Sequence, residues 1–162
     1  MTTEANTELR DRNRQILVES IQQFVKWDHS KPDAASGGYA GGRYPDLWTD
    51  DAIFETPFSP DGWINRRVGR AALEIEAQMR YNLFSHYAWK EPFEVHDMLD
   101  PNKFLLFTEG KGESKEGTKY HNKYVFFVTM RDGKIYHMRQ YFDGGNLAPI
   151  YQETIAAEPE TA

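Results

Sequence analysis

The feature that most constrains the fold is a hairpin pattern near the C-terminal end of the sequence. Two runs rich in aromatic and β-branched residues, 119–130 and 134–142, flank the dipeptide Asp132-Gly133. This dipeptide favours the tight turn of a β-hairpin, and strands joined by a short turn pair antiparallel. We therefore predict two long antiparallel strands as the framework of the fold.

The preceding segments extend this framework. Runs at 93–98 and 103–112, separated by a turn, predict two more strands of the same meander. Apolar residues near helical spacing predict one helix from about Thr7 to Trp27 and a second over 70–87. A short helical tail follows the last strand.

The region between the two helices is less regular. Residues 28–46 are rich in glycine, proline and small polar residues, which predicts a long loop. Leu47-Trp48 predicts a short helical turn and Ala52–Thr56 a strand that ends at a proline. Residues 59–69 predict a second loop or a small hairpin.

Helices that precede a strand meander favour an α+β domain. We expect a curved antiparallel sheet wrapped around the N-terminal helices, which is a cystatin-like α+β cone or barrel. The chain has 162 residues, 40% of them hydrophobic, which fits one domain over 1–162 with its own core. The polar ends, near 1–8 and 156–162, are expected to be flexible.

Composition excludes several classes of function. The net charge is −6 and the basic residues are scattered, which argues against nucleic-acid binding. There is no cysteine, and the five histidines show no metal-ligand spacing, so no metal site is expected. No apolar run approaches the ~20 residues of a membrane span. The polar N-terminus lacks a secretory signal, so a cytoplasmic protein is expected.

Glu76 is the first candidate for chemistry. It lies three residues after Leu73 and three before Met79, in or beside the apolar stripe of the second helix. A carboxylate there loses hydration, which raises its pKa and suits it to general acid–base work. The alternative is that Glu76 is exposed, or paired with Arg80 at i+4.

Gln140 is the second candidate. Alternation along the last strand places Gln140 on one face and the polar set His137, Arg139 and Asp143, with Ile135 and Tyr141, on the other. Gln140 either bonds to a neighbouring strand or water, or lines a ligand cavity and positions a substrate carbonyl or amine. The residues expected beside it on this face are Tyr136, Met138 and Phe142.

Other polar residues are candidates for the same cavity. His121 titrates near neutral pH and could transfer protons, although an exposed histidine at the strand end is the alternative. Asn122 would hydrogen-bond the ligand. Arg43 and Tyr44 lie in the long loop, which either folds over the pocket mouth or is a simple connector. Arg43 or Arg80 would pair with a substrate carboxylate.

The segments "LWTDDAIFETPF", "VGRAAL" and "NKYVFFVTMRDGKIYHMRQYFD" resemble the SnoaL-like, ketosteroid-isomerase-like (nuclear-transport-factor-2-like) cone superfamily. In those isomerases the base lies around "FETPF", where this chain has Thr56. A closer resemblance, over 13–146, is to the phenazine-biosynthesis A/B family, through "DPNKF", "EGKG", "HNKY", "RDGKI" and "MRQYF".

The phenazine resemblance implies a small dimeric cone that condenses two aminated cyclic ketones without a cofactor. Aligned without gaps, the catalytic histidine and glutamate of that family fall on Glu76 and Gln140. We therefore expect an enzyme of secondary metabolism acting on a small cyclic or aromatic ligand. The alternatives are a ligand-binding protein without activity, or a polyketide- or steroid-type isomerase, cyclase or dehydratase. A homodimer is expected through Trp89, Phe93 and Tyr141 on the convex face.

Overall fold

The computed structural model describes residues 3–26, 28–33, 38–40 and 44–157. In chain order the elements are α1 (Thr3–Lys26), β1 (Asp28–Asp33), β2 (Gly38–Ala40), the 3-10 turn η1 (Tyr44–Leu47), β3 (Trp48–Glu55), β4 (Arg66–Val68), α2 (Arg70–Leu83), β5 (Phe84–Trp89), β6 (Glu94–Asp97), β7 (Lys103–Ser114), β8 (Lys119–Arg131), β9 (Lys134–Tyr141) and α3 (Gly144–Ala157).

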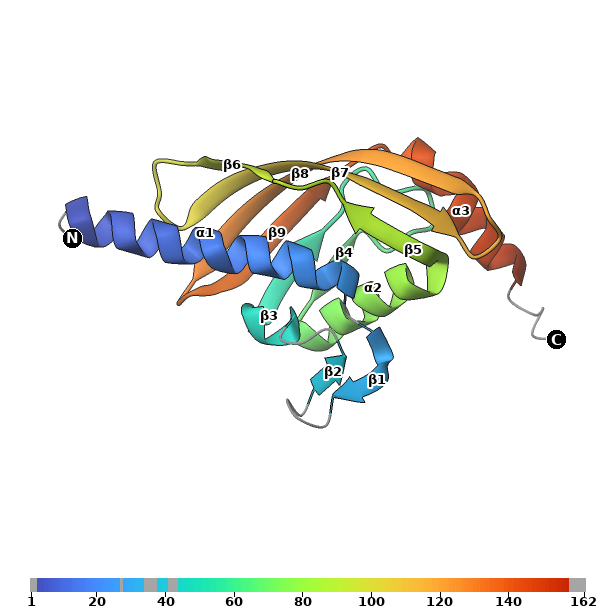
Figure 1. Ribbon diagram of the computed structural model, residues 1–162, viewed down its shortest axis with the longest axis horizontal. Helices are drawn as coiled ribbons and strands as arrows, with labels where there is room; N and C mark the ends of the chain where they lie inside the picture. The colour runs from blue at the N-terminus through green and yellow to red at the C-terminus, as the bar shows by residue number, and fades with distance from the viewer. Residues whose placement is uncertain (1–2, 27, 34–37, 41–43, 158–162) are drawn as a thin grey trace.

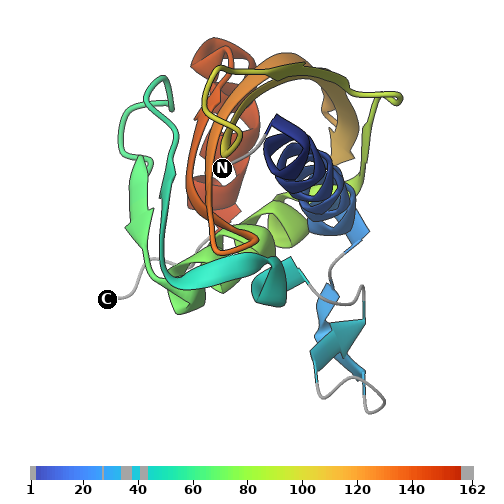
Figure 2. The same cartoon turned by 90° about the vertical axis from the view of Figure 1, so that its left-hand side faces the viewer.

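The expected α+β cone is confirmed. A seven-stranded sheet with the order β4-β3-β9-β8-β7-β5, and with β6 also paired to β7, curves around α1 and α2. Figure 2 looks along α1 and shows the long strands bending over it, with α3 at the far side. The small β1–β2 hairpin projects from the body below the ends of α1 and α2 (Figure 1).

Three expectations for the elements are wrong in detail. The segment expected to be only a loop contains the antiparallel pair β1 and β2. Trp48 begins strand β3 instead of ending a helical turn. The second helix ends at Leu83, and Phe84–Trp89 forms strand β5 because β7 offers an antiparallel partner along its length.

The sheet is mixed, since β3 pairs parallel with β9 while the other pairs are antiparallel. Glu55 of β3 lies opposite Arg139 of β9 in this parallel pair. The β3–β4 hairpin on the outer side of β3 agrees with the small hairpin expected over 59–69. The parallel pairing brings the end of β3 to the end of β9, next to the start of α3.

A bulge in the β8–β9 pair changes which residues of β9 face inward. The register shifts between Thr129 and Met130, so Met130 lies opposite Ile135 and Thr129 opposite His137. Ile135 is therefore fully buried, and Tyr136 has no partner in the ladder. The expected alternation is wrong for these two residues because one extra residue reverses the phase of a strand.

The core lies between the concave face of the sheet and the two long helices. From α1, Leu17 and Ile21 pack at helical spacing against the rings and aliphatic chains of the central strands. The largest fully buried side chains are Trp48, Phe104 and Phe126.

Candidate functional site

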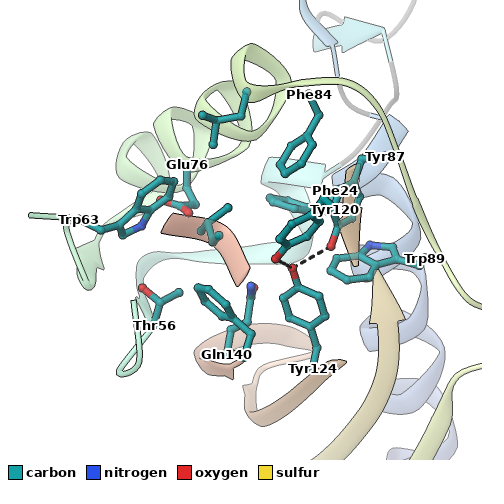
Figure 3. Close-up of a pocket in the computed structure, with 13 residues that line it drawn as sticks. Phe24, Thr56, Trp63, Glu76, Phe84, Tyr87, Trp89, Tyr120, Tyr124 and Gln140 are labelled. Carbon is teal, nitrogen blue, oxygen red and sulfur yellow. Dashed lines mark hydrogen bonds between the residues drawn. The ribbon is translucent and has the colours of Figure 1, made fainter. Parts of the chain in front are cut away.

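A cavity opens between α2, the concave face of the sheet and the beginning of α3 (Figure 3). It encloses about 480 Å³ of space not filled by atoms, its open mouth included. The centre of a water molecule can occupy about 50 Å³ of it, so the cavity suits a small ligand. The lining side chains are Phe24, Thr56, Trp63, Glu76, Leu83, Phe84, Tyr87, Trp89, Tyr120, Tyr124, Gln140, Phe142 and Leu147.

Glu76 enters this cavity from α2. It lies between the fully buried Leu73 and Ala77 on the inner face of the helix, and only 8% of its surface is exposed. Figure 3 shows its carboxylate directed away from the helix and into the cavity. The expectation that Glu76 belongs to the buried stripe is confirmed, and the exposed alternative is wrong.

Arg67, on β4, is the ion-pair partner of Glu76. Its Nε lies 2.5 Å from Glu76 Oε2, and its Nη2 donates to Met79 Sδ at 2.9 Å. Burial raises the pKa of Glu76, and the hydrogen bond and charge of Arg67 offset this only in part. The pKa of the Glu76 carboxyl group thus lies closer to neutral pH than that of an ordinary glutamate. This is the property that a general acid–base group requires.

Gln140 and Thr56 reach the cavity from the sheet side. In Figure 3 the amide of Gln140 points from β9 towards α2. Within the described residues this amide makes no hydrogen bond, so its N–H and C=O groups are available to a ligand. The Thr56 hydroxyl lies 2.5 Å from the hydroxyl of Ser59, which fixes its position at the cavity wall.

Three tyrosine hydroxyl groups form a cluster on the opposite side of the cavity. Tyr87 Oη donates to Tyr124 Oη at 3.0 Å, and Tyr120 Oη lies 2.5 Å from Tyr124 Oη. Asn122 Nδ2 donates to Tyr120 Oη at 3.0 Å. Burial raises the pKa values of Tyr120 and Tyr124, so both remain protonated hydrogen-bond donors.

The cavity therefore has two chemically different sides. Figure 3 shows Glu76, Trp63 and Thr56 on one side and the three tyrosines with Trp89 on the other, with Gln140 between them. One side offers a carboxyl group with a raised pKa, and the other offers neutral phenols that can stabilise a negatively charged oxygen. A ring-shaped carbonyl compound between them would contact both.

Comparisons with known proteins agree with this architecture. The structure superposes on a phenazine biosynthesis-related protein, PhzB2, of Pseudomonas aeruginosa with a TM-score of 0.70 and 19% identity, covering 93% of this chain and 92% of that one. An NTF2-like protein of Burkholderia xenovorans superposes with a TM-score of 0.66 and 20% identity, covering 86% and 95%. The chain has the NTF2-like fold.

Sequence comparisons give less information about this chain than the structural comparisons do. No family model matches the chain. The uncharacterized protein YesE of Bacillus subtilis is 28% identical over 101 residues, which are 62% of this chain and 68% of the relative. The expected resemblance to the phenazine and cone proteins is thus confirmed at the level of the NTF2-like fold.

Four of the expected site residues line the cavity of this NTF2-like fold. Glu76, Gln140, Thr56 and Phe142 meet there from α2, β9 and the end of β3. Met138 is on the same face of β9 but is buried in the core. Tyr136 lies outside the cavity because of the bulge, with the guanidinium of Arg131 4.0 Å from its ring.

His121 and Asn122 are not part of the cavity wall. His121 is exposed on the convex face, with Nε2 2.9 Å from Glu109 Oε2. The Asn122 amide donates to Asp143 O at 2.8 Å as well as to Tyr120, so it orients the tyrosine cluster instead of meeting a ligand directly. Arg43 and the side chains of Tyr44 and Arg80 lie outside the described residues.

The sequence reasoning missed the aromatic side of the cavity. Tyr120 and Tyr124 alternate with exposed residues on β8, so the strand pattern could have placed both on the inner face. Tyr87 was missed because its segment was expected to be helical, and Trp89 was missed because it was expected on the convex face. The expectation for Trp89 is wrong, since this residue lines the cavity.

Two further kinds of site are absent from the described part of the chain. It contains no group of three or more His, Cys, Asp or Glu side chains that could hold a metal ion. None of its helices combines the length and the apolar character needed to cross a membrane.

Proposed function

We propose that the protein is an enzyme of secondary metabolism that transfers protons on a small cyclic carbonyl compound without a cofactor. The observation that supports this best is the placement of Glu76. It is buried, its pKa is raised, and it shares one cavity with an unpaired amide and a phenol cluster. PhzB2, which has the same fold, is described as phenazine biosynthesis-related, and this supports the metabolic context.

In the proposed reaction, the ionised Glu76 takes a proton from the carbon next to the substrate carbonyl. The C–H electron pair forms a C=C bond, and the carbonyl π electrons move to its oxygen. A phenolic O–H of the tyrosine cluster donates to the resulting enolate oxygen. Where the substrate carries a C=C bond β,γ to the carbonyl, the enolate is a dienolate. Glu76 then returns the proton to the γ carbon, the enolate oxygen re-forms the C=O bond, and the C=C bond has moved into conjugation, which completes an isomerisation.

The same groups would serve a condensation of a cyclic ketone with an amine. The amine nitrogen attacks the carbonyl carbon, and the tyrosine cluster donates to the alkoxide that forms. One proton moves from the attacking nitrogen to this alkoxide and gives a carbinolamine. Protonated Glu76 supplies the second proton with which the oxygen leaves as water, and its carboxylate then takes the remaining proton from the iminium nitrogen, which leaves a C=N bond. Gln140 would hold the amine or a second carbonyl, because an amide orients a ligand but does not transfer its proton.

Hydrogen–deuterium exchange into cyclic ketones tests the proposal without knowledge of the natural substrate. A panel of one- and two-ring ketones and ketocarboxylic acids is incubated with the protein in D₂O and followed by NMR. We expect exchange with the wild type and a loss of about 10²- to 10⁴-fold in Glu76→Gln. Glu74→Gln, on the same helix but outside the cavity lining, should keep the wild-type rate.

The second candidate is a ligand-binding protein without turnover. It is favoured by Gln140, which is an amide where the phenazine resemblance places a catalytic glutamate. In that case ligands would bind, as seen by quenching of the cavity residues Trp63 and Trp89, but no member of the panel would exchange. Equal exchange rates in wild type and Glu76→Gln would remove Glu76 from the mechanism.

A further inference from the structure

Two glycines of β7 lie beneath the ring of Tyr87, which lines the cavity. Gly110 and Gly112 alternate on the inner face of the strand, between β5 on one side and β8 on the other. They belong to the "EGKG" segment. Their lack of a side chain leaves space that a neighbouring ring occupies.

The ring in that space is Tyr87. A Cβ atom on Gly110 would lie 1.9 Å from Tyr87 Oη, 2.7 Å from Tyr87 Cζ and 2.9 Å from Tyr124 Cε2. A Cβ atom on Gly112 would lie 3.1 Å from Tyr87 Cδ2 and 2.7 Å from the carbonyl oxygen of His86. The glycines therefore lie beneath the two ends of the ring, Gly110 under the hydroxyl and Gly112 under the base.

This arrangement lets the Tyr87 side chain contact a residue that is not its neighbour in the strand pairing. Tyr87 pairs with Gly112, whereas Tyr124 lies on the next strand opposite Thr108. The ring leans along β7, passes over Gly110, and brings its hydroxyl to 3.0 Å from Tyr124 Oη. Any side chain at Gly110 would occupy the place of that hydroxyl.

The contact with Tyr87 decides how the phenolic hydrogens are used. Asn122 must donate to Tyr120, because Asn122 Oδ1 already accepts from the backbone N–H groups of Lys123 and Asp143. With Tyr87 donating to Tyr124, the short contact between Tyr120 and Tyr124 uses one of their two hydrogens. The other hydrogen of that pair is left to donate to a ligand in the cavity.

We propose that Gly110 and Gly112 are positioning residues, which seat Tyr87 so that the Tyr120–Tyr124 pair presents one O–H group to an oxyanion on a six-membered ring. The inference deepens the proposed function and rests on it for the identity of the oxyanion, an enolate. The binding of an oxyanion can nevertheless be measured without any proton transfer from carbon, so the two proposals can fail separately.

The probe is 4-nitrophenol, a one-ring phenol with no hydrogen next to a carbonyl. We expect the wild type to favour bound 4-nitrophenolate, so that the bound probe ionises at a lower pH than the free probe, as seen in its absorbance. Tyr87→Phe should weaken phenolate binding by roughly three- to tenfold, on the scale of one hydrogen bond between neutral groups, because Tyr87 donates to Tyr124 and not to the phenolate. Tyr136→Phe, whose side chain lies outside the cavity, should leave it unchanged.

Gly110→Ala tests the glycine itself. It should weaken phenolate binding to the same extent as Tyr87→Phe, and the double variant should be no worse than either single one, because both act through one contact. Additive losses, or a Gly110→Ala variant that binds phenolate like the wild type, would overturn the proposal. If Gly110→Ala does not fold, Gly110→Ala combined with Tyr87→Ala must restore folding, since the tightest clashes are with Tyr87.

Binding of 4-nitrophenolate by Glu76→Gln separates this inference from the proposed function. Glu76→Gln should bind 4-nitrophenolate at least as well as the wild type, because it removes a carboxyl group from the cavity. If no ketone exchanges hydrogen at carbon but 4-nitrophenolate binds as expected in the wild type and the variants, the proposed reaction is contradicted and the role of the glycines is not. Exchange that survives in Tyr87→Phe with unchanged phenolate binding would sink the glycine proposal alone.

Discussion

At the scale of single residues, the chemistry depends on the balance between burial of Glu76 and its contact with Arg67. Burial raises the pKa of Glu76 above the ordinary value of 4.5, and Arg67 works in the other direction. The folded state therefore holds this proton more tightly than the unfolded state. The resulting contribution to stability is complete below the unfolded-state pKa and is lost as the pH rises through the folded-state pKa.

We predict that Arg67→Gln moves the acid limb of the exchange activity to higher pH. The reaction uses ionised Glu76 as base, so the rate falls as the pH drops through its pKa, and loss of the Arg67 charge raises that pKa further. The measurement is the pH dependence of the exchange rate, with a ¹³C titration of the Glu76 carboxyl group. Arg66→Gln, which removes a cation bonded to Glu55 instead, should leave the limb in place.

The sequence was sufficient to place Glu76 but not Arg67. Helical spacing around Leu73 and Ala77 turns Glu76 inward whatever it meets there. Arg67 faces it only because β4 folds back along β3, and this long-range pairing leaves no mark in the local pattern. The tyrosine cluster depends in the same way on a three-strand register that single-sequence reasoning does not supply.

At the scale of elements, one carboxylate joins three strands. Glu55 of β3 accepts from His137 Nε2 at 2.7 Å and Arg139 Nε at 2.9 Å, both on β9, and lies 3.3 Å from Arg66 Nε on β4. Burial raises the pKa of Glu55, but the hydrogen bonds from Arg139 and His137 outweigh it, so the pKa is lowered. The parallel β3–β9 contact is thus supported by charge as well as by its ladder.

We predict that Glu55→Gln lowers the free energy of unfolding by about 1.5–3 kcal/mol, the range for hydrogen bonds to a charged group. Because the pKa of Glu55 is lowered, its contribution is present above the unfolded-state pKa and lost as the pH falls through the folded-state value. Urea unfolding at neutral and at acid pH measures both effects. Glu94→Gln removes an exposed carboxylate paired only with His96 and should cost at most about 0.5 kcal/mol.

The element-scale errors of the sequence analysis share a physical cause. The meander from β6 to β9 was predictable because short turns dictate neighbouring antiparallel strands. The segment 84–87 was expected to be helical because local spacing does not report that β7 needs a partner on its open edge. The β9 bulge is a further case, since an extra residue is visible only against the opposite strand.

At the scale of the whole molecule, the expected homodimer remains a prediction. Part of the convex face is apolar: Phe58 is 64% exposed and stacks edge-on with Tyr141, and Phe107 lies two strands away. Exposed apolar patches mark interaction surfaces. Light scattering should give a mass of about twice 18.8 kDa, which Phe107→Lys should lower.

Leu99 supplies the control for that measurement. It is fully exposed in the turn before β7, away from the central strands, and Leu99→Lys should keep the mass of the wild type. A monomeric mass for the wild type at micromolar concentration would contradict the prediction. The cone and its cavity are described within one chain, so activity and association can be measured independently.

The parallel pairing of β3 with β9 also has a consequence for biosynthesis. Glu55 and Arg139 are 84 positions apart, so a ribosome releases the first partner long before it makes the second. Until then β3 has only the short β4 as a neighbour, and its other edge is open to foreign strands. Contacts of such long sequence separation also slow folding. The nascent chain therefore spends most of its translation with an unfinished sheet, which is when a chaperone would be of most use to it.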